Sequence, residues 1–161
     1  MMDFDEIYQD IQAFLQNPES KDHAGAFWDS CALIWVDWRD DDESVVEYIN
    51  ESLPPEVRIE YEVRDCTAPR GVDIFIKNGG VCTPVPYPAD RTDKDLTLRV
   101  IQACLTPAYG LRLYTGSQNC DTLAFCVLPA GRWRQLEAAF GIGIVSRHFR
   151  PIGPNSRMFD A

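Results

Sequence analysis

Histidine, lysine and long apolar runs are all scarce in this chain of 161 residues, which has only 2 histidines. No apolar stretch approaches the roughly 18–20 residues that a membrane-spanning helix needs, so we expect no membrane-embedded segment. The acidic start, MMDFDEIYQD, lacks the basic and then apolar pattern of a secretory signal. We therefore expect a cytoplasmic protein.

Sequence motifs of the common enzyme classes are missing as well. There is no GxxxxGK[ST] or strand-linked GxGxxG for phosphate binding, and GxSxG, HExxH and SxxK do not occur. The cysteines form no CxxC pair and have no closely spaced histidine, so we expect no structural zinc site and no other cofactor. We expect six reduced thiols, mostly as small buried apolar side chains, at Cys31, Cys66, Cys82, Cys104, Cys120 and Cys126.

The net charge of −10 is unevenly distributed. Residues 1–66 hold 18 acidic and 4 basic side chains, whereas residues 67–161 hold 7 acidic and 11 basic ones. This balance disfavours nucleic acid and anionic membranes, both of which need a basic surface. It favours a basic protein partner that binds the N-terminal half. Arginine outnumbers lysine 12 to 3, which is typical of a GC-rich genome and suggests a bacterial source.

The order of apolar patterns predicts the fold class. Helical periodicity covers Asp3–Gln16, Ser44–Leu53, Asp90–Leu105 and a segment that begins at Pro129, whereas residues 18–26 have the polarity of a loop. Strand patterns cover Cys31–Trp38, Val57–Arg64, Val72–Lys77, Val81–Val85, Leu111–Thr115, Thr122–Leu128 and Ile142–Phe149. Hairpins mixed with single helices indicate an α+β fold, a largely antiparallel sheet packed against about four helices. We expect one domain over residues 1–161, with an irregular tail from about residue 151.

Asn78-Gly79 predicts a tight hairpin turn between two of the strands.

The inward faces of these elements predict the core. Apolar positions on the predicted inward faces are Leu33, Trp35, Ile59, Tyr61, Ile74, Ile101, Leu123, Phe125, Leu136 and Phe140.

An acidic segment at a strand-to-helix junction is the main candidate site. Its residues are Asp37, Trp38, Asp40, Asp41, Asp42 and Glu43. Carboxylates here could cap and solvate the helix, bind a divalent cation, or dock the Lys and Arg side chains of a partner with Trp38 as anchor. The docking hypothesis predicts that Asp40, Asp41 and Asp42 are solvent-exposed and unpaired within the chain.

Small size, acidity, the aspartate cluster and the lack of catalytic motifs together resemble bacterial toxin-immunity proteins. The segment LIWVDWRDDDE, Leu33 to Glu43, carries this resemblance. Such proteins are small and cytoplasmic, and they neutralise a cognate toxin, often a basic nuclease, by direct occlusion. The resemblance implies a non-enzymatic protein-binding domain with a basic toxin as partner.

Two other function classes stay open. The first is a small enzyme that uses a metal-bound aspartate cluster, or Cys120 as a nucleophile with His148 as its base. The second is a structural or regulatory protein that self-associates through an exposed sheet edge.

Overall fold

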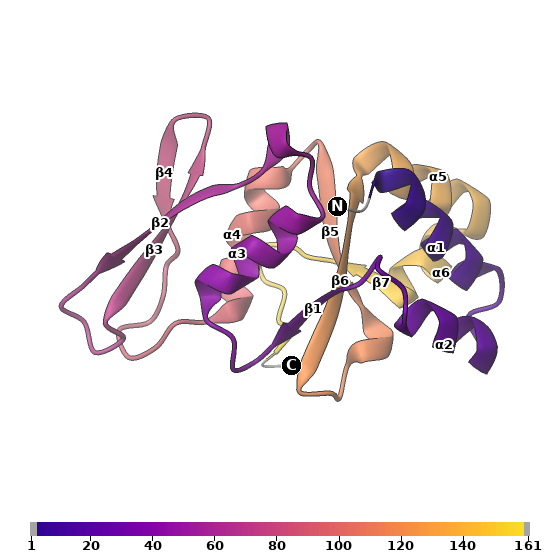
Figure 1. Cartoon of the computed structure of the whole chain (residues 1–161), viewed down its shortest axis with the longest axis horizontal. Helices are drawn as coiled ribbons and strands as arrows, with labels where there is room; N and C mark the ends of the chain where they lie inside the picture. Colours follow the sequence, from indigo (N-terminus) through magenta and orange to yellow (C-terminus); the bar gives the residue numbers. More distant parts are fainter. Residues whose placement is uncertain (1–2, 160–161) are drawn as a thin grey trace.

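Two antiparallel sheets and the helices packed on them form residues 3–159, the part of the chain that this computed structural model describes (Figure 1). The α-helices are α1 (Phe4–Gln16), α2 (Lys21–Trp28), α3 (Asp42–Glu51), α4 (Lys94–Leu105), α5 (Ala130–Phe140) and α6 (Ile142–His148). The strands are β1 (Ile34–Asp37), β2 (Glu60–Asp65), β3 (Val72–Asn78), β4 (Val81–Pro84), β5 (Tyr109–Tyr114), β6 (Thr122–Pro129) and β7 (Phe149–Pro151). The α+β class is confirmed.

Sheet A, with strand order β1–β6–β5–β7, separates two hydrophobic cores. Its central strand β6 is buried over 123–128, and alternate side chains point to opposite faces. The odd-numbered ones join a core with α3 and α4, and the even-numbered ones join a core with α1, α2, α5 and α6. Because both faces are covered, β6 is apolar along its length instead of alternating.

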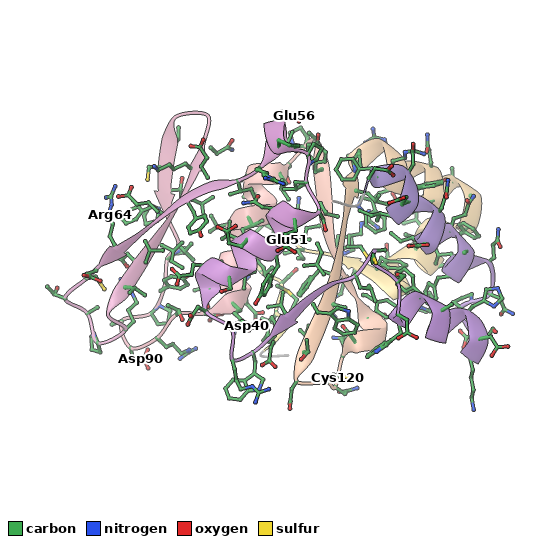
Figure 2. All side chains as sticks on the ribbon, in the orientation of Figure 1. Asp40, Glu51, Glu56, Arg64, Asp90 and Cys120 are labelled. Carbon is green, nitrogen blue, oxygen red and sulfur yellow. The ribbon has the colours of Figure 1, made fainter. Side chains whose placement is uncertain are left out.

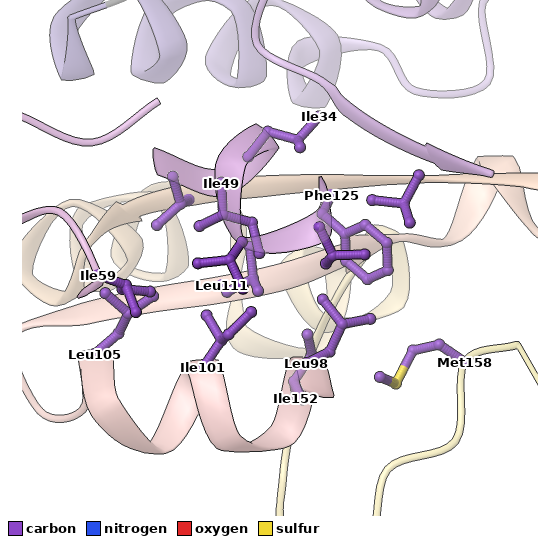
Figure 3. Packing of buried hydrophobic residues seen from close by; sticks show 14 of the residues in the cluster. Ile34, Ile49, Ile59, Leu98, Ile101, Leu105, Leu111, Phe125, Ile152 and Met158 are labelled. Atoms are coloured by element: carbon purple, nitrogen blue, oxygen red, sulfur yellow. The ribbon is translucent and has the colours of Figure 1, made fainter. Parts of the chain in front are cut away.

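Sheet B, with order β2–β3–β4, continues the first of these cores and lies at the left of Figure 1. Ile74 and Ile76 of β3 point inward, to the core that α3 and α4 share with sheet A. Figure 3 shows the centre of that core, where Leu98 and Ile101 of α4 lie beneath Leu111. This arrangement places the start of α3 between the two sheets.

The turn between β3 and β4 confirms the hairpin that Asn78-Gly79 predicted. Asn78 pairs with Val81, so Gly79 and Gly80 form a two-residue loop. Their φ angles are +56° and +84°, a region in which side chains other than glycine are strained.

Two elements differ from the sequence prediction. Residues 18–26 were expected to form a loop, but α2 begins at Lys21, where Ser20 caps the helix by accepting a hydrogen bond from the His23 N–H. The segment Ile142–Phe149 was expected to be a strand, but it forms α6 up to His148. Only Val145 of α6 is buried. The apolar run that resembles a strand in the sequence therefore forms a short helix on the surface.

The predicted core is confirmed at most positions. Trp35, Tyr61 and Phe140 are only half-buried, because each lies at the margin of a core cluster. The one sheet expected from the strand pattern is split into two. Residues 152–159 form no helix or strand, although Ile152 and Met158 are buried in the first core.

Candidate functional site

The acidic segment leads from β1 into α3, and its backbone is fixed by short-range hydrogen bonds. The Asp37 N–H donates to Asp40 Oδ2 at 2.9 Å, and the Trp38 N–H donates to the Asp121 carbonyl at 3.3 Å. The second bond connects the segment to the start of β6. The loop thus has a defined shape, which presents its side chains in a fixed arrangement.

Asp37 is neutralised within the segment itself. Arg39 donates from Nε at 3.1 Å and from Nη2 at 2.9 Å to its carboxylate. These bonds, with that from the Arg39 backbone N–H, hold the pKa of Asp37 well below its usual range. Asp37 is therefore ionised at neutral pH, and its negative charge is balanced by Arg39. It contributes little net charge to the surface.

Asp42 is buried, which contradicts the expectation that it is exposed and unpaired. Its side chain is only 1% exposed. The hydroxyls of Thr97 and Tyr87 donate to its Oδ2 at 2.6 and 3.0 Å, and Lys94 Nζ lies 3.5 Å from Oδ1. Burial, followed by the charge of Asp42, raises the pKa of Tyr87, so this hydroxyl stays protonated as a donor. Asp42 thus joins α3 to α4 and is not available to a partner.

Asp40 also differs from the expectation, because it is half-buried and accepts the Asp37 N–H, so of the three aspartates only Asp41 is exposed and unpaired within the described residues. Asp41 is the N-cap of α3, but its side chain makes no capping hydrogen bond, and it is exposed. Asp40 and Glu43 are half-buried, and Trp38 is 58% exposed. Asp121, which the sequence analysis missed, is exposed and raises the pKa of Arg39 through its charge. We call Trp38, Asp40, Asp41, Glu43 and Asp121 the acidic surface.

An open hollow of about 570 Å³ lies beside the acidic surface, between α3 and sheet B. Its near wall contains five of the six residues that the sequence predicted, Trp38, Asp40, Asp41, Asp42 and Glu43. Its far wall contains residues that the sequence analysis missed, Val63, Arg70, Val72, Ile74, Thr92 and Lys94. Figure 2 shows Asp40 on the loop between β1 and α3.

The three basic residues that line the hollow are all engaged, and Arg39 pairs with Asp37 at 2.9 Å. Lys94 lies against Asp42, and Arg70 pairs with Asp73 and donates to the carbonyls of Val72 and Pro88 at 3.1 Å each. The hollow therefore combines an apolar wall with an acidic rim. Such a site fits a Lys or Arg side chain with its aliphatic stem.

The residues of the alternative enzyme hypotheses are not brought together. Cys120 is exposed, whereas His148 packs its ring edge against Phe14 with centroids 5.4 Å apart. Burial lowers the pKa of His148, and within residues 3–159 no hydrogen bond joins it to Cys120. The described residues also contain no group of three or more His, Cys, Asp or Glu side chains arranged to hold a metal ion.

The thiols are less buried than expected. Only Cys126 is buried; Cys66 and Cys104 are half-buried, and Cys31, Cys82 and Cys120 are exposed. All six cysteines are free of disulfides in the structure. Their reduced state in solution stays a prediction.

Comparison with known proteins identifies no relative, since no family model, curated protein or solved structure matches the chain. None of the helices in the described part of the chain combines the length and apolar character required to cross a membrane.

Proposed function

We propose that this chain is a non-enzymatic protein-binding domain of the immunity type, which neutralises a basic toxin by covering it with the acidic surface. Exposed side chains at one end of α3 support this proposal. Asp37 and Asp42 stabilise the loop and the helix from within, and the acidic surface contacts the partner.

The observation that carries the proposal is an exposed tryptophan, Trp38, close to an exposed carboxylate, Asp41, that makes no bond within the described residues. Trp38 leaves 58% of its surface in water. The neighbouring Asp41 has no side-chain hydrogen bond or ion pair within the described residues, although its N-cap position offers one. Large aromatic residues are frequent binding anchors, and unpaired charges speed the encounter of proteins.

The two kinds of side chain have different roles in binding. The carboxylates attract a basic surface over a distance of about 8–10 Å, the screening length at physiological salt, and so raise the association rate. Trp38 contributes after contact, when its exposed ring is removed from water, and so lowers the dissociation rate.

The test removes three charges without disturbing the buried Asp42. The variant Asp40→Asn with Asp41→Asn and Glu43→Gln keeps the loop, because an Asn carbonyl oxygen at position 40 still accepts from the Asp37 N–H. With the partner captured from the native host, we expect slower association and a weaker dependence of the rate on salt. Trp38→Ala is expected to increase the dissociation rate instead.

A matched control removes three exposed charges around α2, with Glu19→Gln, Asp22→Asn and Asp29→Asn. This control changes the net charge equally but leaves the acidic surface intact. Equal association rates for the two triple variants at low salt would show that the acidic surface has no specific role.

A further inference from the structure

The outer edge of β2 carries backbone hydrogen-bonding groups that point out of sheet B. The Cys66 N–H donates to the Gly71 carbonyl at 3.0 Å, which fixes the alternation of bonds between β2 and β3. The even-numbered residues of β2 are therefore bonded to β3. Tyr61, Val63 and Asp65 turn their N–H and C=O groups to the opposite side.

This edge is open, whereas the other edge of the same sheet is not. In the described residues β2 pairs with β3 alone, and the Val63 side chain is 38% exposed. At the β4 edge, the Cys82 N–H points outward, but Pro84 has no N–H and a further proline follows at Pro86. Proline blocks the addition of a strand, so of the two edges of sheet B, as the structure describes it, the β2 edge is the one that can accept a strand.

Carboxylates border the open edge on its inner face. The Tyr61 hydroxyl donates a hydrogen bond to Glu47 of α3, and the charge of Glu43 also acts on Tyr61. Asp65 shares this face because it alternates with Val63 along β2. β2 contacts α3 and extends from it to the left of Figure 2, where Arg64 is labelled.

The outer face of the edge has a different charge balance. Arg64 pairs with Glu62 at 2.9 Å and lies over the Phe75 ring at 4.3 Å, and Lys77 lies 3.8 Å from Glu62. Glu60, two residues before Glu62 on β2, shares this face and is exposed, so two positive and two negative side chains balance there. A strand added here would therefore meet negative charge on one face and a nearly neutral surface on the other.

We propose that the open edge of β2 binds an extended segment of a partner protein as an added strand, with Lys or Arg at alternate positions facing α3. Main-chain hydrogen bonds come from Tyr61, Val63 and Asp65, and the basic side chains reach Glu43 and Glu47. The inference rests on the proposed function, because Val63 also lines the hollow beside the acidic surface. A second copy of this chain fits less well, since it would bring the same acidic residues to the edge.

The first experiment uses a defined probe, an acetylated and amidated (Lys-Thr)4 peptide, followed by NMR of the uniformly labelled full chain. We expect binding to slow hydrogen exchange at the amides of Tyr61, Val63 and Asp65, for which residues 3–159 provide no hydrogen-bond acceptor. An acetylated (Glu-Thr)4 peptide and a block Lys4Thr4 peptide are the controls for charge and for pattern. Binding of the (Lys-Thr)4 peptide without slower exchange at these amides would overturn the proposal, as would equal binding of the block peptide.

The second experiment blocks the edge. Val63→Pro removes an outward N–H that β3 does not use, so the sheet is retained, and Cys82→Pro removes the outward N–H of β4 as the matched control. We expect Val63→Pro to weaken peptide binding roughly tenfold, because one or two main-chain hydrogen bonds are lost. Cys82→Pro is expected to leave peptide binding unchanged. The double variant Glu43→Gln with Glu47→Gln does not alter the strand. It is expected to lower the affinity for the peptide and to make that affinity less dependent on salt concentration.

The outcomes separate this inference from the proposed function. If the acidic-surface triple variant slows association of the captured partner but Val63→Pro does not, the proposed function stands and strand addition is wrong. If neither variant has an effect, both are wrong. If the unliganded chain sediments as a dimer with the Val63 amide protected from exchange, the edge belongs to a second copy and the proposal fails.

Discussion

Neighbouring aspartates at the start of α3 have opposite environments, and the helical repeat explains why. Asp42 precedes the buried residues Val45, Val46 and Ile49 by three, four and seven positions, so it lies on the same inward face. Asp41 is one residue earlier and faces the solvent. The spacing was visible in the sequence, but charge alone suggested exposure.

Removal of the Asp42 carboxylate tests its role in stability. Asp42→Ala leaves Lys94, with a side chain only 11% exposed, without its partner. Because breaking a buried ion pair costs roughly 3–5 kcal/mol, we expect a loss of that size in the free energy of unfolding. Asp41→Ala is the control and should cost less than about 1 kcal/mol, since its carboxylate makes no cap bond. Equal losses in urea denaturation would contradict the assignment.

Tyr61 is expected to titrate late. Its hydrogen bond to Glu47, with desolvation and nearby carboxylate charge, raises its pKa from 10.0 to about 12. The unfolded chain then loses this proton at lower pH than the folded chain, so the contribution of Tyr61 to stability falls as pH rises from 10.0 to about 12. The difference in phenolate absorbance between wild type and Tyr61→Phe measures the pKa. Glu47→Gln should lower it, and an unchanged value would exclude the hydrogen bond as the cause.

Among the elements, long amphipathic or alternating segments were predictable and short ones were not. The helices α1, α3, α4 and α5 and six of the strands follow from periodicity, within a few residues at each end. The short helices α2 and α6 have one buried residue each, Phe27 and Val145, so they lack the apolar stripe that identifies a helix.

The candidate site was predictable only in part. The acidic segment could be found because its residues are consecutive. Val63 and Val72, on the opposite wall of the hollow, come from sheet B. Only tertiary packing brings that sheet against α3, and no local pattern encodes this approach.

The packing of α4 provides the test at this scale. Ile101 is fully buried between α4 and sheet A, as Figure 3 shows. Ile101→Ala should reduce the free energy of unfolding by roughly 2–5 kcal/mol through loss of contacts and a cavity. The adjacent Val100 is half-buried, so Val100→Ala should cost clearly less. A loss below about 0.5 kcal/mol for Ile101→Ala would mean that this face of α4 is not packed in the core.

At the scale of the whole molecule, sheet A unites distant parts of the chain. Its edge strand β1 pairs with β6, and β5 pairs with β7, so the two cores on its faces share one framework. A change in one core is therefore expected to affect the other core through the shared strand β6.

The last described residues are bound back onto α4. The buried Asp95 carboxylate accepts from the backbone N–H groups of Met158 and Phe159, and Arg99 donates to the Ser156 carbonyl at 2.7 Å. Met158 is buried in the same core as Ile34. During synthesis on the ribosome, that core therefore lacks a component until residue 158 has left the exit tunnel. We expect part of its apolar surface to stay accessible to chaperones until then, so that this core is completed only after residue 158 has emerged.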